Sequence, residues 1–152
     1  MAARALVALP MLLGIVIGAI WPPAMQWASV DLPEWARWSG VLLGLLTLPA
    51  VHWVLSSLGK NVSETVLTKK DHALVTIGPY RWIRHPLYTN GIALVVSLGL
   101  VQSSWFILLL AAIGFVLINL VVIPAEERAL VAKFGDGYRT YMTGTGRMFP
   151  RV

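Results

Sequence analysis

Cysteine is absent from this chain of 152 residues, and charged residues are scarce. Without cysteine there can be no disulfide and no thiolate ligand for a metal ion. Only 12% of the residues are charged, whereas an average soluble domain has about 25%. The hydrophobic share is 57% and the mean hydropathy is +0.73. These values exclude an ordinary soluble domain and predict an integral membrane protein that forms one domain over residues 1–152.

Histidine and glycine patterns exclude two further classes of site. The three histidines, His52, His72 and His85, have no metal-ligand spacing, so no metal site is expected. No GxGxxG pattern occurs, so a Rossmann dinucleotide fold is not expected. The net charge of +5 could suggest a nucleic-acid partner. However, membrane proteins gather basic residues in their cytoplasmic loops, and we therefore expect no nucleic-acid partner.

Four apolar segments predict an all-α fold, a polytopic membrane bundle of about four transmembrane helices with a cytoplasmic C-terminal helical segment. They run from about Ala5 to Trp21, Trp38 to Leu58, Leu87 to Val101 and Trp105 to Ile123. The third is short for a span, since about 20 residues cross the hydrocarbon. Only residues 102–104 separate the last two segments, which predicts a tight antiparallel hairpin.

The basic residues predict the orientation. In a four-span arrangement eleven of the twelve fall on one side, and only Arg37 falls on the other. The eleven are Arg4, Lys60, Lys69, Lys70, Arg81, Arg84, Arg128, Lys133, Arg139, Arg147 and Arg151. Because the side rich in Lys and Arg is the cytoplasmic one, both termini are expected in the cytoplasm, and the protein in a bacterial inner membrane.

The predicted hairpin brings two polar segments together. The third apolar segment begins after His85, and the fourth ends just before Glu126 and Glu127. Two antiparallel helices of similar length would place these ends on the same side, about 10 Å apart. Pro124 removes a helical hydrogen bond and is expected to bend the last span.

The first of these segments has the features of an anion site. Pro86 suits the first turn of a helix, where its missing N–H costs nothing. The free N–H groups of that turn attract an anion, and Arg84 and His85 add positive charge.

The second segment has the features of a cation site. Glu126 and Glu127 can bind an amine or ribose hydroxyls, and the rings of Tyr80 and Tyr88 can face a cation. Together the two segments fit a zwitterionic, cationic molecule such as S-adenosylmethionine. Equally, the arginines and glutamates could form interfacial salt bridges that anchor the helix ends, and the residues alone leave both readings open.

The same residues resemble a known signature, that of the isoprenylcysteine carboxyl methyltransferase family, which is related to the membrane phospholipid N-methyltransferases. The resemblance covers residues 74–150. It rests on Leu74 to Tyr88, with its Arg84-His85-Pro86-Leu87-Tyr88 core, on Glu126-Glu127-Arg128-Ala129-Leu130, and on Phe134-Gly135, Tyr138 and Tyr141.

The resemblance implies transfer of a methyl group from S-adenosylmethionine to a lipophilic acceptor at the cytoplasmic face, either an isoprenylcysteine-like carboxylate or a lipid. It implies a membrane-lipid environment, with Glu127 and His85 as catalytic candidates. The implied cofactor-binding residues are Gly78, Tyr80, Arg84, His85, Pro86, Tyr88, Glu126 and Glu127. Asn90 departs from the family pattern, which often has glycine there.

The reaction would be an in-line displacement at the sulfonium methyl, so alignment and exclusion of water are the main tasks of the protein. A carboxylate acceptor needs no base, whereas an amine or hydroxyl acceptor could use Glu126, Glu127 or His85. Two alternatives remain. One is an NADPH-dependent membrane reductase with a similar arginine-histidine-proline segment. The other is a non-enzymatic scaffold or permeation subunit. The acceptor and the oligomeric state stay open.

Overall fold

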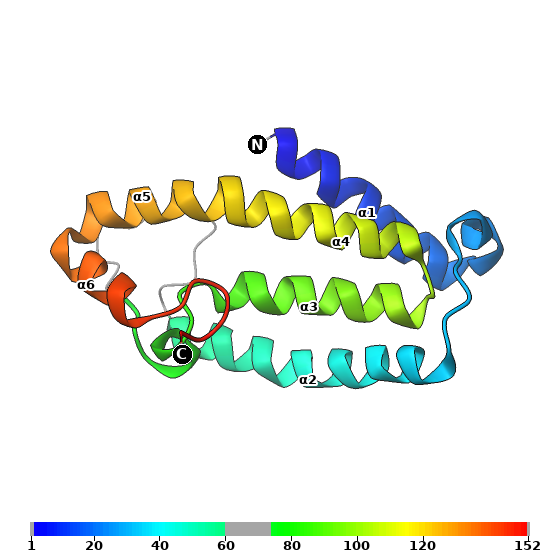
Figure 1. Cartoon of the computed structure of the whole chain (residues 1–152), viewed down its shortest axis with the longest axis horizontal. Helices are drawn as coiled ribbons and strands as arrows, with labels where there is room; N and C mark the ends of the chain where they lie inside the picture. Colours follow the sequence, from blue (N-terminus) through cyan, green and yellow to red (C-terminus); the bar gives the residue numbers. More distant parts are fainter. Residues whose placement is uncertain (1, 60–73, 152) are drawn as a thin grey trace. The chain divides into compact units, whose positions relative to one another are not determined.

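The computed structural model describes residues 2–59 and 74–151. These residues form helices joined by short connections, with isolated β-bridges and no strand among them (Figure 1). The elements are α1 (Ala2–Ile20), η1 (Pro22–Ala28), α2 (Glu34–Leu58), η3 (Gly78–Arg81), α3 (Pro86–Val101), α4 (Trp105–Leu117), the π-helix η4 (Ile118–Val122), α5 (Ile123–Phe134) and α6 (Asp136–Gly144).

The chain forms two compact units. Unit 1 comprises Met1–Leu48 and Gly91–Leu117, and unit 2 comprises Pro49–Asn90 and Ile118–Val152. Helices α2 and α3 each contribute residues to both units.

Unit 1 contains the turn between α3 and α4, which is as tight as the sequence predicts. Ser103 has a φ of 50°, and its carbonyl accepts the N–H of Val30 at 2.8 Å. The side-chain amide of Gln102 donates to the carbonyl of Ile15 in α1 at 3.2 Å. Helix α1 also packs along α4. The hairpin is therefore fixed by hydrogen bonds to the N-terminal residues as well as by its length.

Two glycines of α2 allow α3 to approach closely within unit 1. A Cβ at Gly40 would lie 2.7 Å from Leu100 Cβ, and one at Gly44 would lie 2.6 Å from Ser97 Oγ. The Ser97 hydroxyl donates to the carbonyl of Gly40 at 2.8 Å. The glycine pair is therefore a contact surface within one chain, where small residues let helix backbones meet.

Replacing Gly40 by alanine is expected to lower the stability of the protein. The gain in helix propensity of about 1 kcal/mol is outweighed, because the new methyl group would meet backbone atoms as well as Leu100. Gly91→Ala is the matched control, since Gly91 also lies within a helix and a Cβ added there would meet nothing within 4 Å. Thermal unfolding of both variants in detergent measures this difference in stability. Equal unfolding midpoints for Gly40→Ala and Gly91→Ala would contradict the prediction.

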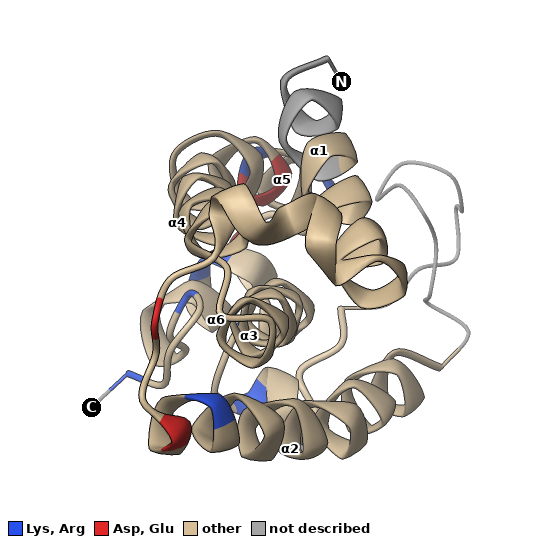
Figure 2. Cartoon of the chain, turned by 90° about the vertical axis from the view of Figure 1, so that its right-hand side faces the viewer, with Lys and Arg blue, Asp and Glu red and all other residues tan. Residues whose placement is uncertain are grey.

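Large apolar side chains of α2 lie on its surface: Leu42, Leu45, Leu46 and Leu48 are each about 60% exposed. No charged residue occurs in α3 or α4, which are tan along their length in Figure 2. By length and composition two helical segments could cross a membrane, Glu34–Leu58 and Trp105–Phe134. The apolar helices Leu9–Ile20 and Pro86–Val101 are shorter. The all-helical fold is confirmed, whereas a count of four spans stays a prediction.

The loop used to predict the orientation is described only in part. Lys60, Lys69 and Lys70 lie outside the described residues, as does His72. The cytoplasmic placement of both termini therefore stays a prediction.

The second segment of unit 2 starts at Ile118, where the helix type changes. The long helical segment from Trp105 widens to a π-helix over Ile118–Val122, which ends two residues before Pro124. Proline cannot donate to the carbonyl four residues earlier, and a wide turn is one way to absorb the missing bond. Helix α5 then ends at Phe134, and the φ of 56° at Gly135 lets the chain turn into α6. This region positions Glu126 and Glu127 in the first turns of α5.

Candidate functional site

A buried carboxylate, that of Glu127 in α5, is the centre of the polar side chains in unit 2. Glu127 is 5% exposed. Arg84 Nε lies 2.9 Å from its Oε1, Arg147 donates to its Oε2 at 3.2 Å, and His85 Nε2 lies 3.3 Å from Oε1. A carboxylate with two guanidinium partners stays ionised, and these charge-assisted bonds offset its removal from water.

Arg84 also ties the end of α6 to the site. Its terminal nitrogen donates to the carbonyl of Met142 at 3.0 Å and, in a short hydrogen bond, to that of Thr145. One guanidinium thus joins three partners that are 43 to 61 residues away in sequence. The planar fork of arginine permits this, whereas a single ammonium group could not reach all three.

Tyr88 and Glu126 form the more open part of the site, next to the buried His85. The Tyr88 hydroxyl donates to Glu126 Oε2 at 3.0 Å, and the His85 ring stacks on the Tyr88 ring with centroids 5.8 Å apart. His85 Nδ1 lies 3.8 Å from Glu126 Oε2. The side chain of Glu126 is 26% exposed, against 6% for Glu127. Glu126 is therefore the carboxylate of the pair that a ligand can reach.

Burial lowers the pKa of His85 below its usual value of 6.5, and the carboxylates of Glu126 and Glu127 oppose this only in part. His85 is therefore neutral at pH 7. The unfolded chain binds a proton on this residue more readily than the folded one, so the contribution of His85 to stability falls as the pH drops below about 6.5.

We expect the stability difference between the wild type and His85→Gln to shrink between about pH 7 and pH 5, by at most about 1.4 kcal/mol per pH unit. Thermal unfolding of both proteins in detergent across this range measures it. A difference that is constant or grows toward low pH would mean that His85 is not held neutral.

A C-terminal strap, residues 145–150, runs along the segment that precedes α3. The N–H of Arg84 donates to the carbonyl of Gly146 at 2.8 Å, and the N–H of His85 donates to that of Arg147 at 3.0 Å. The Thr89 hydroxyl donates to the carbonyl of Met148 at 2.8 Å. The N–H groups of Arg84 and His85 are thus already paired by the strap, and any anion must bind to other donors.

Three tyrosines close the site on the side of α6. The Tyr141 hydroxyl donates to the carbonyl of Tyr80 at 2.5 Å, and burial raises the pKa of Tyr141 to about 12, so this donor keeps its proton. Tyr138 is 2% exposed, and its hydroxyl has no hydrogen-bond partner among the described residues. Burial and the nearby charge of Glu127 raise the pKa of Tyr138. This protonated hydroxyl is a buried donor beside the cluster, without a partner among the described residues.

The structure brings five of the eight predicted site residues into one cluster: Arg84, His85, Tyr88, Glu126 and Glu127. Tyr80 is buried next to the cluster, and its backbone bonds to α6. Gly78 lies elsewhere: with a φ of 59° it packs against Ser57 and Trp53 of α2. The eighth residue, Pro86, opens α3 as predicted, on another face of its first turn.

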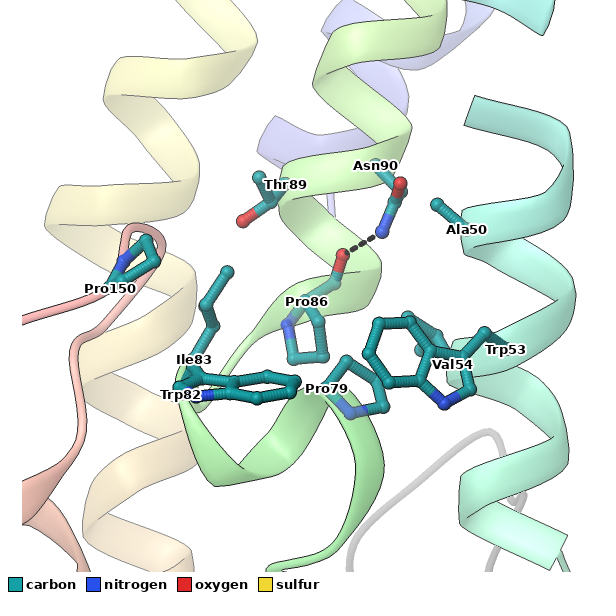
Figure 3. Close-up of a pocket in the computed structure, with 10 residues that line it drawn as sticks. All are labelled: Ala50, Trp53, Val54, Pro79, Trp82, Ile83, Pro86, Thr89, Asn90 and Pro150. Carbon is teal, nitrogen blue, oxygen red and sulfur yellow. Dashed lines mark hydrogen bonds between the residues drawn. The ribbon is translucent and has the colours of Figure 1, made fainter. Parts of the chain in front are cut away.

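Pro86 lines a pocket in unit 2 with a volume of about 470 Å³. Figure 3 shows side chains from α2, from η3 and the residues after it, from the first turn of α3 and from the strap around this space. The lining residues are Ala50, Trp53, Val54, Pro79, Trp82, Ile83, Pro86, Thr89, Asn90 and Pro150. None of them is charged.

Sequence reasoning missed several partners of the site. The carbonyls of Met142, Thr145 and Met148 are backbone groups, and residue identity does not reveal where a backbone group will bond. Thr89 and Asn90 follow the motif directly, and their spacing from Pro86 could have placed all three on one helical face. In residues 2–59 and 74–151 no group of three or more His, Asp or Glu side chains could hold a metal ion.

Comparisons with known proteins identify a family and a fold. The family described as phospholipid methyltransferase matches residues 35–137. The cobalt-zinc-cadmium resistance protein CzcN of Cupriavidus metallidurans is 32% identical over 120 residues, which cover 77% of this chain and 55% of that protein. The protein-S-isoprenylcysteine O-methyltransferase of Schizosaccharomyces pombe is 33% identical over 85 residues, covering 55% of this chain and 36% of that protein.

Among solved structures, the fold is similar to that of a eukaryotic intramembrane Ras methyltransferase, isoprenylcysteine carboxyl methyltransferase. The TM-score is 0.71 and the identity is 21%, and the match covers all of this chain and 53% of that one. The match therefore spans about half the length of CzcN and of the solved methyltransferase, and about a third of the Schizosaccharomyces pombe methyltransferase.

Proposed function

Because the chain belongs to the phospholipid methyltransferase family, we propose that it transfers the methyl group of S-adenosylmethionine to a lipophilic acceptor. The observation that supports this most is the pairing of the Arg84–Tyr88 segment with Glu126 and Glu127 in one cluster. These are the residues on which the resemblance to isoprenylcysteine carboxyl methyltransferases rests, and they are about 40 positions apart in the chain.

The donor set fits the cofactor. Glu126 offers a partly exposed carboxylate for an ammonium or for ribose hydroxyls, and Tyr138 offers a buried, unpaired hydroxyl. The half-exposed guanidinium of Arg147 can pair with a carboxylate of the ligand. When bound, S-adenosylmethionine supplies a methyl group that its sulfonium charge already activates.

The main task of the protein is to hold the cofactor and the acceptor in line, and the geometry of the cluster suits that task. Arg84 and Glu127 are fully engaged with each other and with the strap, so they fix the positions of their neighbours. Glu126, Tyr88 and Arg147 then bind the ligand from fixed positions. We assign Glu126 to cofactor binding and Glu127 to positioning. Neutral His85 is the group that can accept a proton if the acceptor is an amine, thiol or hydroxyl.

The remaining parts of the proposal concern the membrane. We propose four spans, both termini in the cytoplasm and a bacterial inner membrane, with the site at the cytoplasmic face. The exposed apolar side chains of α2 and the uncharged α3 and α4 support helices in lipid. Isoprenylcysteine-like carboxylates and membrane lipids are the acceptor classes that the family implies.

Calorimetric titration of S-adenosylmethionine into the purified protein in detergent tests the proposal. We expect saturable binding by the wild type and much weaker binding by His85→Ala, with a folded protein in both cases. No binding by folded wild type between micromolar and millimolar cofactor would overturn it. Tight binding of NADPH instead would favour a reductase. Incubating membranes with methyl-labelled cofactor then identifies the acceptor as the labelled molecule.

A further inference from the structure

The hydroxyl of Tyr138 in α6 is buried beside the charged cluster of unit 2 without a hydrogen-bond partner. Among the described residues two buried side-chain atoms are unpaired, Gln102 Oε1 in unit 1 and this hydroxyl. A buried donor that makes no hydrogen bond keeps the cost of its removal from water, so native proteins hold few of them. Phenylalanine would fill the same space without this cost. The packing of the ring therefore does not account for the hydroxyl.

The surroundings of Tyr138 make its hydroxyl a donor that faces a negative charge. Burial, and after it the charge of Glu127, raise the pKa of Tyr138 well above the usual value. The hydroxyl therefore keeps its proton. An ionised carboxylate such as that of Glu127 can only accept hydrogen bonds. Tyr138 is thus a donor within the electrostatic reach of a buried acceptor that it does not contact in this structure.

The two oxygens of the Glu127 carboxylate are held unequally. Oε1 has two partners, Arg84 Nε at 2.9 Å and His85 Nε2 at 3.3 Å. Oε2 accepts from Arg147 at 3.2 Å and from no other described residue. The side chain of Arg147 is 43% exposed, whereas that of Arg84 is 9% exposed. Arg147 is therefore the partner that can leave, and Oε2 would then lose its donor.

The side chain of Arg147 can move while the strap stays in place. The carbonyl of Arg147 accepts the N–H of His85 at 3.0 Å, and the carbonyl of Gly146 accepts that of Arg84 at 2.8 Å. These backbone bonds do not depend on the contact between the guanidinium and Glu127. A ligand carboxylate at the cluster would compete with Glu127 for this guanidinium. Since a buried carboxylate that loses a partner keeps its desolvation cost, a second donor is needed at Oε2.

We propose that Tyr138 is a positioning residue that replaces Arg147 as the partner of Glu127 when Arg147 binds the carboxylate of the cofactor. The inference rests on the proposed function and deepens it, because the buried hydroxyl then acts through Glu127 and not by contact with the ligand. The exchange needs a rotation of the carboxylate about its terminal torsion, which has no steep preference. Arg84 holds Oε1 in both arrangements, so Glu127 keeps its place in the cluster.

A double-mutant cycle on stability tests the exchange without any cofactor. Tyr138→Phe removes an unpaired hydroxyl, so we expect its unfolding midpoint in detergent to equal or exceed that of wild type. Arg147→Met keeps the length of the side chain but removes its donors. It should lower the midpoint by less than about 2 °C, because Tyr138 then donates to Oε2. The double variant should lose at least about 3 °C more than the sum of the two single changes.

Tyr141→Phe is the matched control for this cycle. The Tyr141 hydroxyl already donates to the carbonyl of Tyr80, so its removal should lower the midpoint by itself and add to the effect of Arg147→Met. Additive effects of Tyr138→Phe and Arg147→Met would overturn the proposed exchange. A loss of stability in Tyr138→Phe as large as that in Tyr141→Phe would also overturn it, because the Tyr138 hydroxyl would then be paired already.

Two ligands that differ in one carboxylate test what triggers the exchange. Calorimetry compares the binding of S-adenosylmethionine with that of decarboxylated S-adenosylmethionine. Tyr138→Phe should weaken binding of the first at least about threefold and leave binding of the second unchanged, because only the first draws Arg147 away from Glu127. Arg147→Met should also weaken binding of S-adenosylmethionine. Adding Tyr138→Phe to Arg147→Met should weaken it no further, since Tyr138 already faces Glu127 in that variant.

The ligand comparison has two outcomes that reject the exchange. Equal weakening of both ligands in Tyr138→Phe would mean that the hydroxyl contacts the cofactor directly. Unchanged binding of both would mean that the cofactor does not engage Tyr138 at all. Failure of the proposed function is a separate result, because wild type would then bind neither ligand. The stability cycle would still decide whether Tyr138 can replace Arg147 beside Glu127.

Discussion

Replacing Arg84 by alanine is expected to lower the free energy of unfolding by about 3–5 kcal/mol. The change removes one of two guanidinium partners from Glu127, which is 5% exposed, and leaves the carbonyls of Met142 and Thr145 without this donor. A buried carboxylate that loses a partner retains its desolvation cost. Unfolding in mixed detergent micelles, followed by circular dichroism, measures the loss.

Two further variants make this result specific. Arg84→Lys keeps the positive charge but loses the planar guanidinium with its several N–H donors. The variant should therefore be less stable than wild type and more stable than Arg84→Ala. Arg139→Ala breaks an exposed pair with Asp136, whose side chains are 65% and 91% exposed, and should change stability by less than about 0.5 kcal/mol. If Arg84→Ala were no more costly than Arg139→Ala, the Arg84–Glu127 pair would not be the structural centre of unit 2.

The two adjacent glutamates are expected to differ sharply when each is changed to glutamine. Glu126→Gln should leave stability nearly unchanged, because its side chain is partly exposed and an amide oxygen still accepts from Tyr88. It should weaken S-adenosylmethionine binding about ten- to hundredfold, as the loss of one charge-assisted hydrogen bond of about 1.5–3 kcal/mol predicts.

Glu127→Gln should lower stability by about 3 kcal/mol or more, since Arg84 then lies buried beside an uncharged amide. Calorimetry and unfolding, measured on the same preparations, separate the two roles. Asp136→Asn, an acid exposed in α6, is the control for both measurements. A stability loss as large in Glu126→Gln as in Glu127→Gln would contradict the assignment of one glutamate to binding and the other to positioning.

Much of the helical organisation could be predicted because local rules govern it. Long apolar segments must pair their backbone groups internally, which predicts helices, and the three residues between Val101 and Trp105 predict a sharp turn. That turn makes the contact between the Arg84–Tyr88 segment and Glu126–Glu127 predictable, although some 40 residues separate them. The structure confirms this contact.

Residue types alone could not decide whether the cluster is a ligand site or a set of salt bridges that anchors the helix ends. Both need arginines opposite glutamates. Burial separates them: Glu127, at 6% side-chain exposure with two guanidinium partners, fits the anchor, whereas Glu126, at 26%, remains accessible. Exposure depends on what the strap and α6 cover, and neither is encoded in the spacing of the motif.

The sequence by itself determined a helical chain of membrane-protein character, the meeting of Arg84–Tyr88 with Glu126–Glu127, and membership of a methyltransferase family. Composition, periodicity and motif identity are local properties, and they suffice for these conclusions. Only the tertiary structure decided which glutamate is buried, that the strap pairs the N–H groups of Arg84 and His85, and that an uncharged pocket lies behind Pro86. These depend on backbone carbonyls and apolar walls, which form only when distant segments pack together.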